Sequence, residues 1–198
     1  MAHPARTFRR STGRPGFRTS FSGVCALLLL VVGLLASAGH AQARTNGLLD
    51  VTCTPPSSAS VTYNPPLTNT PQVSSASLNW QLGPCVSTSV PALTSGTHSA
   101  VNPPRTRTCL ELLNTAAETR TITWNTGATS TLSLNRTTTV AGAVLVVTFT
   151  GTVTAGLFAG DTVVATQTGP ATDILLCTLG LGSVSGVYAP MVVEITSV

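Results

Sequence analysis

Residues 144–164, VLVVTFTGTVTAGLFAGDTVV, contain the clearest periodic pattern in the chain. From Val147 to Thr154, every apolar residue or glycine is followed by a threonine. Successive side chains of a β-strand point to opposite faces of a sheet, so the pattern predicts a strand with one buried and one hydroxylated face. Threonine is β-branched and suits an exposed pleated surface. We therefore expect the threonine row to face solvent; an adhesive or ligand-bearing face is the alternative.

Short alternating runs of the same kind recur along the chain, separated about every ten residues by glycine, proline and asparagine. Helical periodicity is almost absent, although 111–118 could form one short helical turn. Regularly spaced strands of this type are typical of an antiparallel sandwich or barrel. Proline pairs lack ladder donors, so we expect Pro65-Pro66 and Pro103-Pro104 to lie between strands. The expected strands are Leu48–Cys53, Ser60–Tyr63, Val73–Leu82, Cys109–Leu113, Thr119–Trp124, Thr131–Asn135, Ala143–Thr154, Thr162–Gln167, Ile174–Leu179 and Val187–Val198.

The first 43 residues have the parts of a secretory signal peptide. Five arginines precede an apolar stretch from Val24 to about Leu35, and Ala41-Gln42-Ala43 then fits a signal-peptidase site. The apolar stretch is shorter than the ~20 residues that span a bilayer, which argues against a membrane anchor. We expect cleavage before Arg44, no membrane span after cleavage, and a secreted, extracellular protein with one domain over 44–198.

Removal of the leader also removes the basic character of the chain. The mature part has no lysine, and its five arginines face six acidic residues. The basic isoelectric point of the precursor therefore belongs to the leader and does not indicate nucleic-acid binding. The acidic residues are Asp50, Glu111, Glu118, Asp161, Asp173 and Glu194, and the arginines are Arg44, Arg105, Arg107, Arg120 and Arg136.

Four cysteines remain after cleavage, and an even number in an exported chain predicts two disulfides. Cys53 and Cys177 have apolar neighbours, whereas Cys85 lies at a strand end and Cys109 shares a face with an acidic residue. Side-chain parity therefore favours Cys53–Cys177 and Cys85–Cys109 over the two other connectivities. No CxxC motif occurs, and His98 is the single mature histidine, so we expect no metal site.

Catalytic constellations are not recognisable. His98 lies in a polar context typical of a solvated loop, with no G-x-S-x-G motif to supply a serine nucleophile. The six acidic residues are scattered singly, without the paired carboxylates that a glycosidase requires. We therefore expect a protein that is not an enzyme, with no catalytic residues and no cofactor.

Exposed aromatic rows, which carbohydrate-binding modules use to stack on sugars, are also not evident. Trp80 and Trp124 share faces with apolar residues, which indicates core packing. Tyr63 and Tyr188 precede proline-containing turns and could be exposed, but they make a small platform. A carbohydrate-binding module is therefore the second interpretation.

The runs TITWNTG (121–127), NRT (135–137) and GTVTAGLFAGDTVV (151–164) resemble a group of small exported proteins of actinobacteria. Those proteins are mostly uncharacterised, have four mature cysteines and have a predicted all-β, immunoglobulin-like fold. The resemblance covers most of the mature chain. It implies an immunoglobulin-like antiparallel β-sandwich with two disulfides, and it carries no functional residue over to this chain.

The favoured interpretation is a secreted, non-catalytic binding or structural domain that recognises an unknown extracellular or cell-wall ligand. A small secreted protease inhibitor is a third interpretation. In that case 102–108, with Arg105 and Arg107, would form an exposed bait loop that a disulfide from Cys109 holds rigid. The two arginines are more simply explained as ordinary loop charges.

Overall fold

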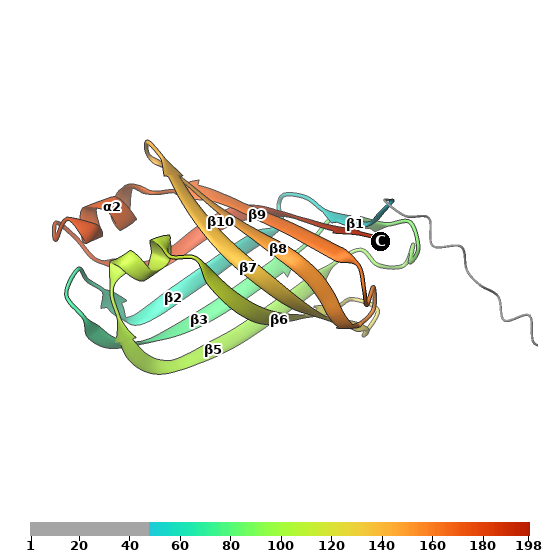
Figure 1. The fold of residues 1–198 in the computed structure, drawn as a ribbon, viewed down its shortest axis with the longest axis horizontal. Coiled ribbons are helices and arrows are strands. Elements are labelled where there is room, and N and C mark those ends of the chain that lie inside the picture. The colour runs from blue at the N-terminus through green and yellow to red at the C-terminus, as the bar shows by residue number, and fades with distance from the viewer. Residues whose placement is uncertain (1–47) are drawn as a thin grey trace, which may run out of the picture. The chain divides into compact units, whose positions relative to one another are not determined.

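The computed structural model describes residues 48–198, and the expected signal peptide and its cleavage site lie outside the described residues. Ten strands, one 3₁₀ helix (η1) and one α-helix (α2) make up this part of the chain (Figure 1). In chain order they are β1 (Leu49–Cys53), β2 (Ser58–Leu67), β3 (Gln72–Leu82), β4 (Cys85–Ser87), β5 (Gly96–Arg107), η1 (Cys109–Leu113), β6 (Ala116–Trp124), β7 (Thr129–Ala141), β8 (Val144–Gly156), β9 (Thr162–Pro170), α2 (Thr172–Thr178) and β10 (Val184–Thr196).

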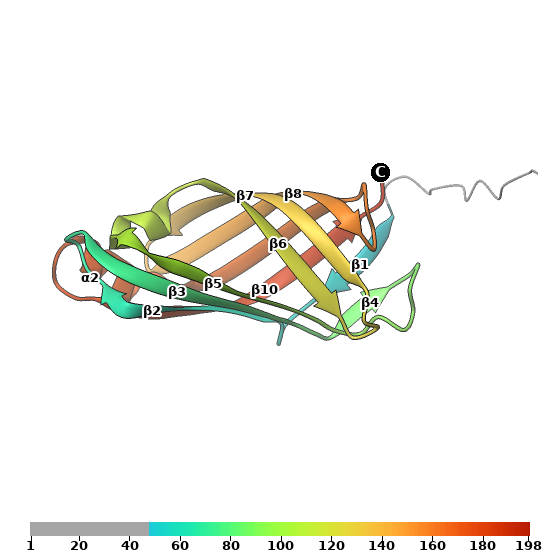
Figure 2. The same cartoon turned by 90° about the horizontal axis from the view of Figure 1, so that it is seen from below.

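Eight of these strands close into an antiparallel barrel. The neighbours follow the order β2-β3-β5-β6-β7-β8-β9-β10, and β10 pairs with β2 to complete the circle (Figure 2). The expected immunoglobulin-like sandwich is therefore wrong, although the all-β class is right. A sandwich needs two separate sheets and long Greek-key connections, whereas these strands form a meander that closes on itself. Alternation and turn spacing are the same in both architectures.

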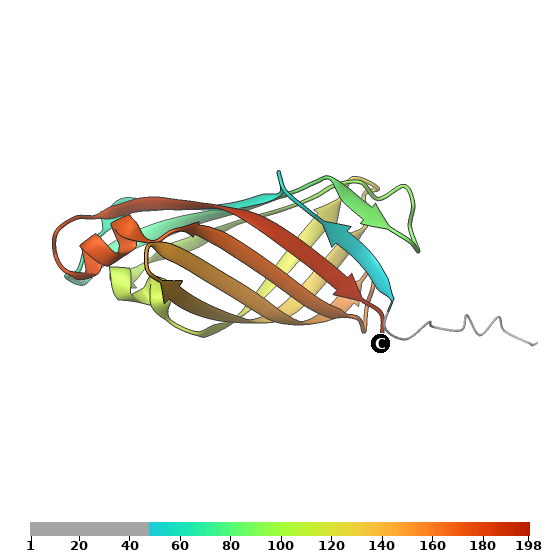
Figure 3. The same cartoon turned by 90° about the horizontal axis from the view of Figure 1, so that it is seen from above.

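Strand β1 and the short strand β4 extend the sheet at one end of the barrel. Residues 193–196 of β10 pair with β1, and β1 pairs in turn with β4 (Figure 3). Cys53 lies opposite Cys85 in this ribbon, and the two form the first disulfide.

The second disulfide joins Cys109 of η1 to Cys177 of α2. The expected pairing of Cys53 with Cys177 is therefore wrong. All four cysteines are buried, so apolar surroundings did not distinguish a core pair from a peripheral pair. We call Cys53–Cys85 the strand disulfide and Cys109–Cys177 the cap disulfide.

The barrel interior is filled by side chains from alternate positions of the strands. On β8, Val147, Phe149 and Val153 are buried, whereas Thr150 and Thr152 are exposed. The prediction that the threonine row faces solvent is confirmed. Burial of Trp80 and Trp124, each 2% exposed, confirms their expected core packing.

Two expected strands are helical, and the stretch between two expected strands contains two further strands. Residues 109–113 form η1, and most of 174–179 lies in α2, because segments this short contain too few residues to distinguish a helical period from that of a strand. Strands β4 and β5 were not expected.

Both proline pairs lie inside strands rather than between them, which is also contrary to expectation. The β3–β5 register shifts between Ser74 and Ala76, opposite Pro103-Pro104, as a bulge permits. Beside the other pair, the Ser74 hydroxyl donates to the carbonyl of Pro65 at 2.7 Å. The bulge and this side-chain bond let the sheet continue past residues that cannot donate to the ladder.

Candidate functional site

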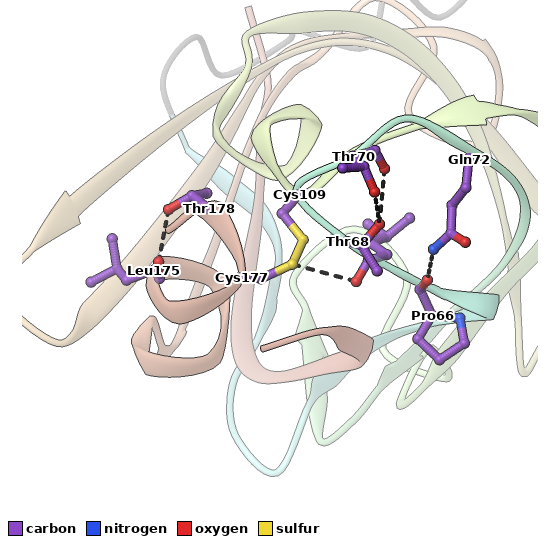
Figure 4. The surroundings of a disulfide bond; sticks show 9 residues. Pro66, Thr68, Thr70, Gln72, Cys109, Leu175, Cys177 and Thr178 are labelled. Atoms are coloured by element: carbon purple, nitrogen blue, oxygen red, sulfur yellow. Dashed lines mark hydrogen bonds between the residues drawn. A yellow bond between two sulfur atoms is a disulfide. The ribbon is translucent and has the colours of Figure 1, made fainter. Parts of the chain in front are cut away.

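One end of the barrel is covered by η1 and α2, which lie together opposite the end that carries β1 (Figures 1 and 3). We call these two helical segments the cap. The cap disulfide joins them directly, and Cys177 Sγ lies 3.4 Å from the carbonyl oxygen of Leu67 at the end of β2 (Figure 4). The amide of Cys109 also donates to the carbonyl of Thr68, at 3.1 Å. The cap is thus tied both to itself and to the β2–β3 connection.

Beneath the cap the interior holds a cavity of about 90 Å³. Leu112 of η1 and Ile174 of α2 line it from the cap, and apolar side chains of β2, β3, β8 and β10 form most of its wall. The full lining is Ala59, Ser60, Val61, Tyr63, Leu78, Trp80, Leu112, Arg120, Arg136, Leu145, Val147, Phe149, Gln167, Gly169, Ile174, Val187 and Ala189.

Aromatic rings and a buried arginine meet at this cavity. Trp80 and Phe149 pack edge to face, with their ring centroids 5.3 Å apart. The guanidinium carbon of Arg120 lies 4.5 Å from the Trp80 ring centroid and 5.2 Å from that of Phe149. Such positions over ring faces are attractive for a cation. The rings therefore hold the guanidinium group against the wall of the cavity.

Arg120 has fewer hydrogen bonds than its charge requires. Its side chain is 6% exposed, and Nη2 donates to Glu118 Oε2 at 2.5 Å. Its Nε and Nη1 atoms have no hydrogen-bond partner among the described residues. Burial lowers the pKa of Arg120 and the nearby Glu118 carboxylate raises it, but a guanidinium group keeps its proton in proteins. Arg120, one of the residues that line the cavity, thus carries a buried positive charge and two buried donors without a partner.

A second arginine lies beside the same carboxylate. Arg136 Nε is 3.8 Å from Glu118 Oε1, too far for a hydrogen bond, and neither atom has another partner within 48–198. Arg136 Nη2 reaches only the backbone carbonyl of Glu111, at 3.5 Å. Glu118 therefore accepts a hydrogen bond from Arg120 but forms only a longer ion pair with Arg136.

Further ion pairs extend this group to the surface. Glu111 accepts two hydrogen bonds from the exposed Arg105 and lies 3.7 Å from the buried Arg107. Arg107 Nε donates to the carbonyl of Ser74 at 3.0 Å. The linked set is called the charged cluster: Arg105, Arg107, Glu111, Glu118, Arg120 and Arg136. It contains four cations and two anions, so the cluster itself has an excess of two positive charges; Asp173 of α2 is a further, exposed acidic residue at the same end.

Tyr63 adds a polar group to the cavity wall. Burial raises the pKa of its hydroxyl, and Arg136 and Arg107 oppose that rise. The hydroxyl is therefore protonated at neutral pH and can both donate and accept. The sequence suggested that Tyr63 could be exposed, but it is half-buried inside the barrel, whereas Tyr188 is exposed.

The barrel wall opens between β5 and β6. Only Gly96 and Thr97 of β5 pair with β6, at Trp124 and Thr123, before the strands diverge toward η1. His98 lies where they separate, and its Nδ1 is 2.9 Å from the carbonyl oxygen of Thr121. His98, which we expected in a solvated loop, is therefore a buried residue of β5, and its ring forms a hydrogen bond with that carbonyl group.

The residues considered for a protease-inhibitor loop also lie elsewhere than expected. Residues 102–107 belong to β5, and the side chain of Arg107 is buried. An exposed, disulfide-braced loop is therefore not formed by this segment.

The sequence did not single out Arg120 or Arg136 as site residues. One signal could have identified Arg120, because it has the same parity as Ile122 and Trp124 and must therefore face the core. Arg136 likewise has the parity of Leu132 and Leu134.

Comparisons of the chain with protein families, curated proteins and solved structures found no match. Within 48–198, no group of histidine, cysteine and acidic side chains is arranged to hold a metal ion. The helices of the same residues are all too short or too polar to cross a membrane.

Proposed function

We propose that this is a secreted binding protein that holds a small, partly apolar molecule inside the capped end of its barrel. The observation that carries the proposal is the interior cavity, whose apolar wall contains the incompletely bonded guanidinium group of Arg120. A few polar groups on an otherwise apolar concave surface are characteristic of small-molecule sites. The interior of an eight-stranded barrel is either filled by side chains or wide enough for one small ligand, and here side chains leave a cavity at the capped end.

The positions of the two tryptophans and the outer face of β8 support this choice. Trp80 and Trp124 are buried, so neither can stack on a sugar from outside the barrel. The outer threonines of β8 offer hydroxyl groups without a hollow or an aromatic platform. Two disulfides indicate an oxidising environment, and the signal-peptide pattern supports export to it.

The proposal is tested by NMR titration of the purified protein with 1-hexanol, benzyl alcohol, hexanoate and benzoate. The indole N–H signal of Trp80 should shift on binding, because this ring lines the cavity. The signal of Trp124 is an internal control, since its N–H donates to Ser130 Oγ at 2.8 Å and the ring is not part of the lining. Binding of none of the four compounds would contradict the proposal.

A matched pair of variants locates the site. Ala189→Leu adds volume to the cavity wall from a buried position and should abolish the Trp80 shift. Thr152→Leu adds a similar side chain to the exposed outer face of β8 and should leave the shift unchanged. Equal binding by both variants would place the ligand outside the cavity.

A further inference from the structure

We infer that the ligand is a small organic carboxylate whose carboxylate group binds Arg120, with Arg136 close by. This inference rests on the proposed function, because it names the chemistry of the molecule that occupies the same cavity. Four features support it: the free donors of Arg120, the charge of the cluster, the apolar wall and the volume.

The free donors require an acceptor. Arg120 uses Nη2 for Glu118, and Nε and Nη1 have no partner in the part of the chain that the structure describes. Buried donors on a charged group are expensive to leave unbonded. Each of these donors shares an edge of the guanidinium group with Nη2, which has a second N–H, so a planar carboxylate could accept from Nη2 together with Nε or Nη1. Hydrogen bonds between ions are stronger than those between neutral groups.

The charge of the cluster favours an anion over a neutral ligand. Its four arginines are balanced by only Glu111 and Glu118, and both carboxylates already have arginine partners. A carboxylate entering beside Arg120 and Arg136 would reduce the excess of two positive charges to one. A cationic ligand would increase it in a poorly solvated site, which is unfavourable.

The apolar wall defines the rest of the molecule. Leu78, Val147 and Ile174 offer hydrocarbon surface, and Trp80 and Phe149 offer aromatic surface. Apart from the indole N–H of Trp80, these side chains have no hydrogen-bonding group, so the many hydroxyl groups of a sugar acid would find too few partners along this wall. An aliphatic or aromatic body attached to one carboxylate fits the lining.

The volume limits the size. One water molecule needs about 10–15 Å³ measured in this way, so a cavity of about 90 Å³ has room for roughly six to nine water-sized groups. Hexanoate and benzoate are of this size, whereas long-chain fatty acids would require the cap to move. The two small acids are therefore the probes.

Calorimetric titration compares each acid with its neutral analogue: hexanoate with 1-hexanol, and benzoate with benzyl alcohol. A bond to a charged group is worth enough to make the acid bind roughly 10- to 100-fold more tightly. Inorganic phosphate should not compete, because it has no apolar body. Equal affinity of acid and alcohol, or displacement by phosphate, would overturn the inference but leave the proposed function standing. Binding of none of the four compounds would overturn the proposed function itself.

Substitutions then assign the contact. Arg120→Met keeps a flexible, unbranched side chain, two atoms shorter than arginine and without charge, and should lower hexanoate affinity roughly 10- to 100-fold, with little change for 1-hexanol. The control is Arg105→Met, because the Arg105 side chain is 57% exposed and already bonded to Glu111. Undiminished hexanoate binding by Arg120→Met would overturn the inference.

A second variant keeps the test valid if Arg120→Met does not fold. Glu118→Gln retains the shape of the side chain and removes the anion that competes for Arg120. Hexanoate affinity should rise several-fold, and 1-hexanol affinity should stay the same. Unchanged or weaker hexanoate binding would count against Arg120 as the carboxylate partner.

Discussion

Replacement of the Glu118–Arg120 ion pair by uncharged side chains separates a role in binding from a role in folding. The proposed double variant is Glu118→Gln with Arg120→Met. An arginine that is 6% exposed beside a carboxylate that is 24% exposed pays a large desolvation penalty. Replacing a buried ion pair by apolar side chains is often neutral or stabilising by about 1–4 kcal/mol, but the glutamine of this variant keeps a polar amide at position 118, which reduces the expected gain. We therefore expect the free energy of unfolding of the ligand-free protein to change by about 0 to +2 kcal/mol, the low end of that range.

The expected gain in unfolding free energy is at the low end of the range because the variant loses contacts of Arg120 with two aromatic rings. Contacts of the guanidinium group with Trp80 and Phe149 are lost in the variant, at about 0.5–2 kcal/mol each. Contacts of the methionine sulfur with the same rings return about 0.3–1.5 kcal/mol. The single Arg120→Met variant should lose about 1–3 kcal/mol, less than the usual 3–5 for breaking a buried pair. The reason is that Glu118 is partly hydrated and retains Arg136 at 3.8 Å.

Guanidinium chloride unfolding at pH 7 with intact disulfides measures both changes, and thermal unfolding should follow by about 2–4 °C per kcal/mol. The wild-type protein, both single variants and the double variant form a complete mutant cycle. A loss of more than about 2 kcal/mol in the double variant would refute the reasoning, because Arg120 would then stabilise the fold despite its unbonded donors.

Three other changes have definite expected outcomes. Alanine substitution of the cap disulfide should lower the free energy of unfolding by about 4.4 kcal/mol, and that of the strand disulfide by about 3.7 kcal/mol. The difference arises because the two bonds close sequence separations of 68 and 32 residues. Denaturant unfolding checks the order of the two losses, and non-reducing peptide mapping checks the pairing. Burial and the charge of Arg120 lower the pKa of His98, although its hydrogen bond to Thr121 raises the pKa in part. His98 therefore takes up a proton more readily in the unfolded chain. Stability should therefore fall as the pH drops below about 6.5, by at most about 1.4 kcal/mol per pH unit, and His98→Gln should flatten this slope in unfolding measurements at pH 5–7. Gly151→Ala places a Cβ atom 1.9 Å from the Ser133 carbonyl oxygen and should destabilise by about 3 kcal/mol, whereas Gly182→Ala, with its nearest neighbour at 3.7 Å, should be tolerated.

The sequence predicted local features well because they depend on a short period. The alternation around Phe149 identified the buried and exposed faces of β8, and the same parity placed Trp80 and Trp124 in the core. These inferences need only the geometry of one strand. They hold equally for a sandwich and for a barrel.

Long-range pairing was not accessible in the same way. The barrel closes because β2 pairs with β10, which is more than a hundred residues away in the sequence. Neither strand has a sequence feature that identifies the other as its partner. The cysteine pairs failed for the same reason, because all four are buried and only the positions of η1 and α2 bring Cys109 to Cys177. The candidate site depends on both events, which is why Arg120 and Arg136 were not connected from sequence.

The closed barrel also changes where a site can lie. The outer face of β8 is a row of threonines, and the described strands close around the interior except between β5 and β6, where the pairing is limited to two residue pairs. Four of the five arginines after residue 43 belong to the charged cluster at the capped end, and two of them line the cavity. The Glu118–Arg120 pair as a whole is not expected to stabilise the fold, because uncharged residues at these two positions would pack without unbonded donors on a buried cation. An anion in the cavity would satisfy those donors, and the mutant cycle and the carboxylate titrations test that explanation from opposite sides: stability without ligand and affinity with it.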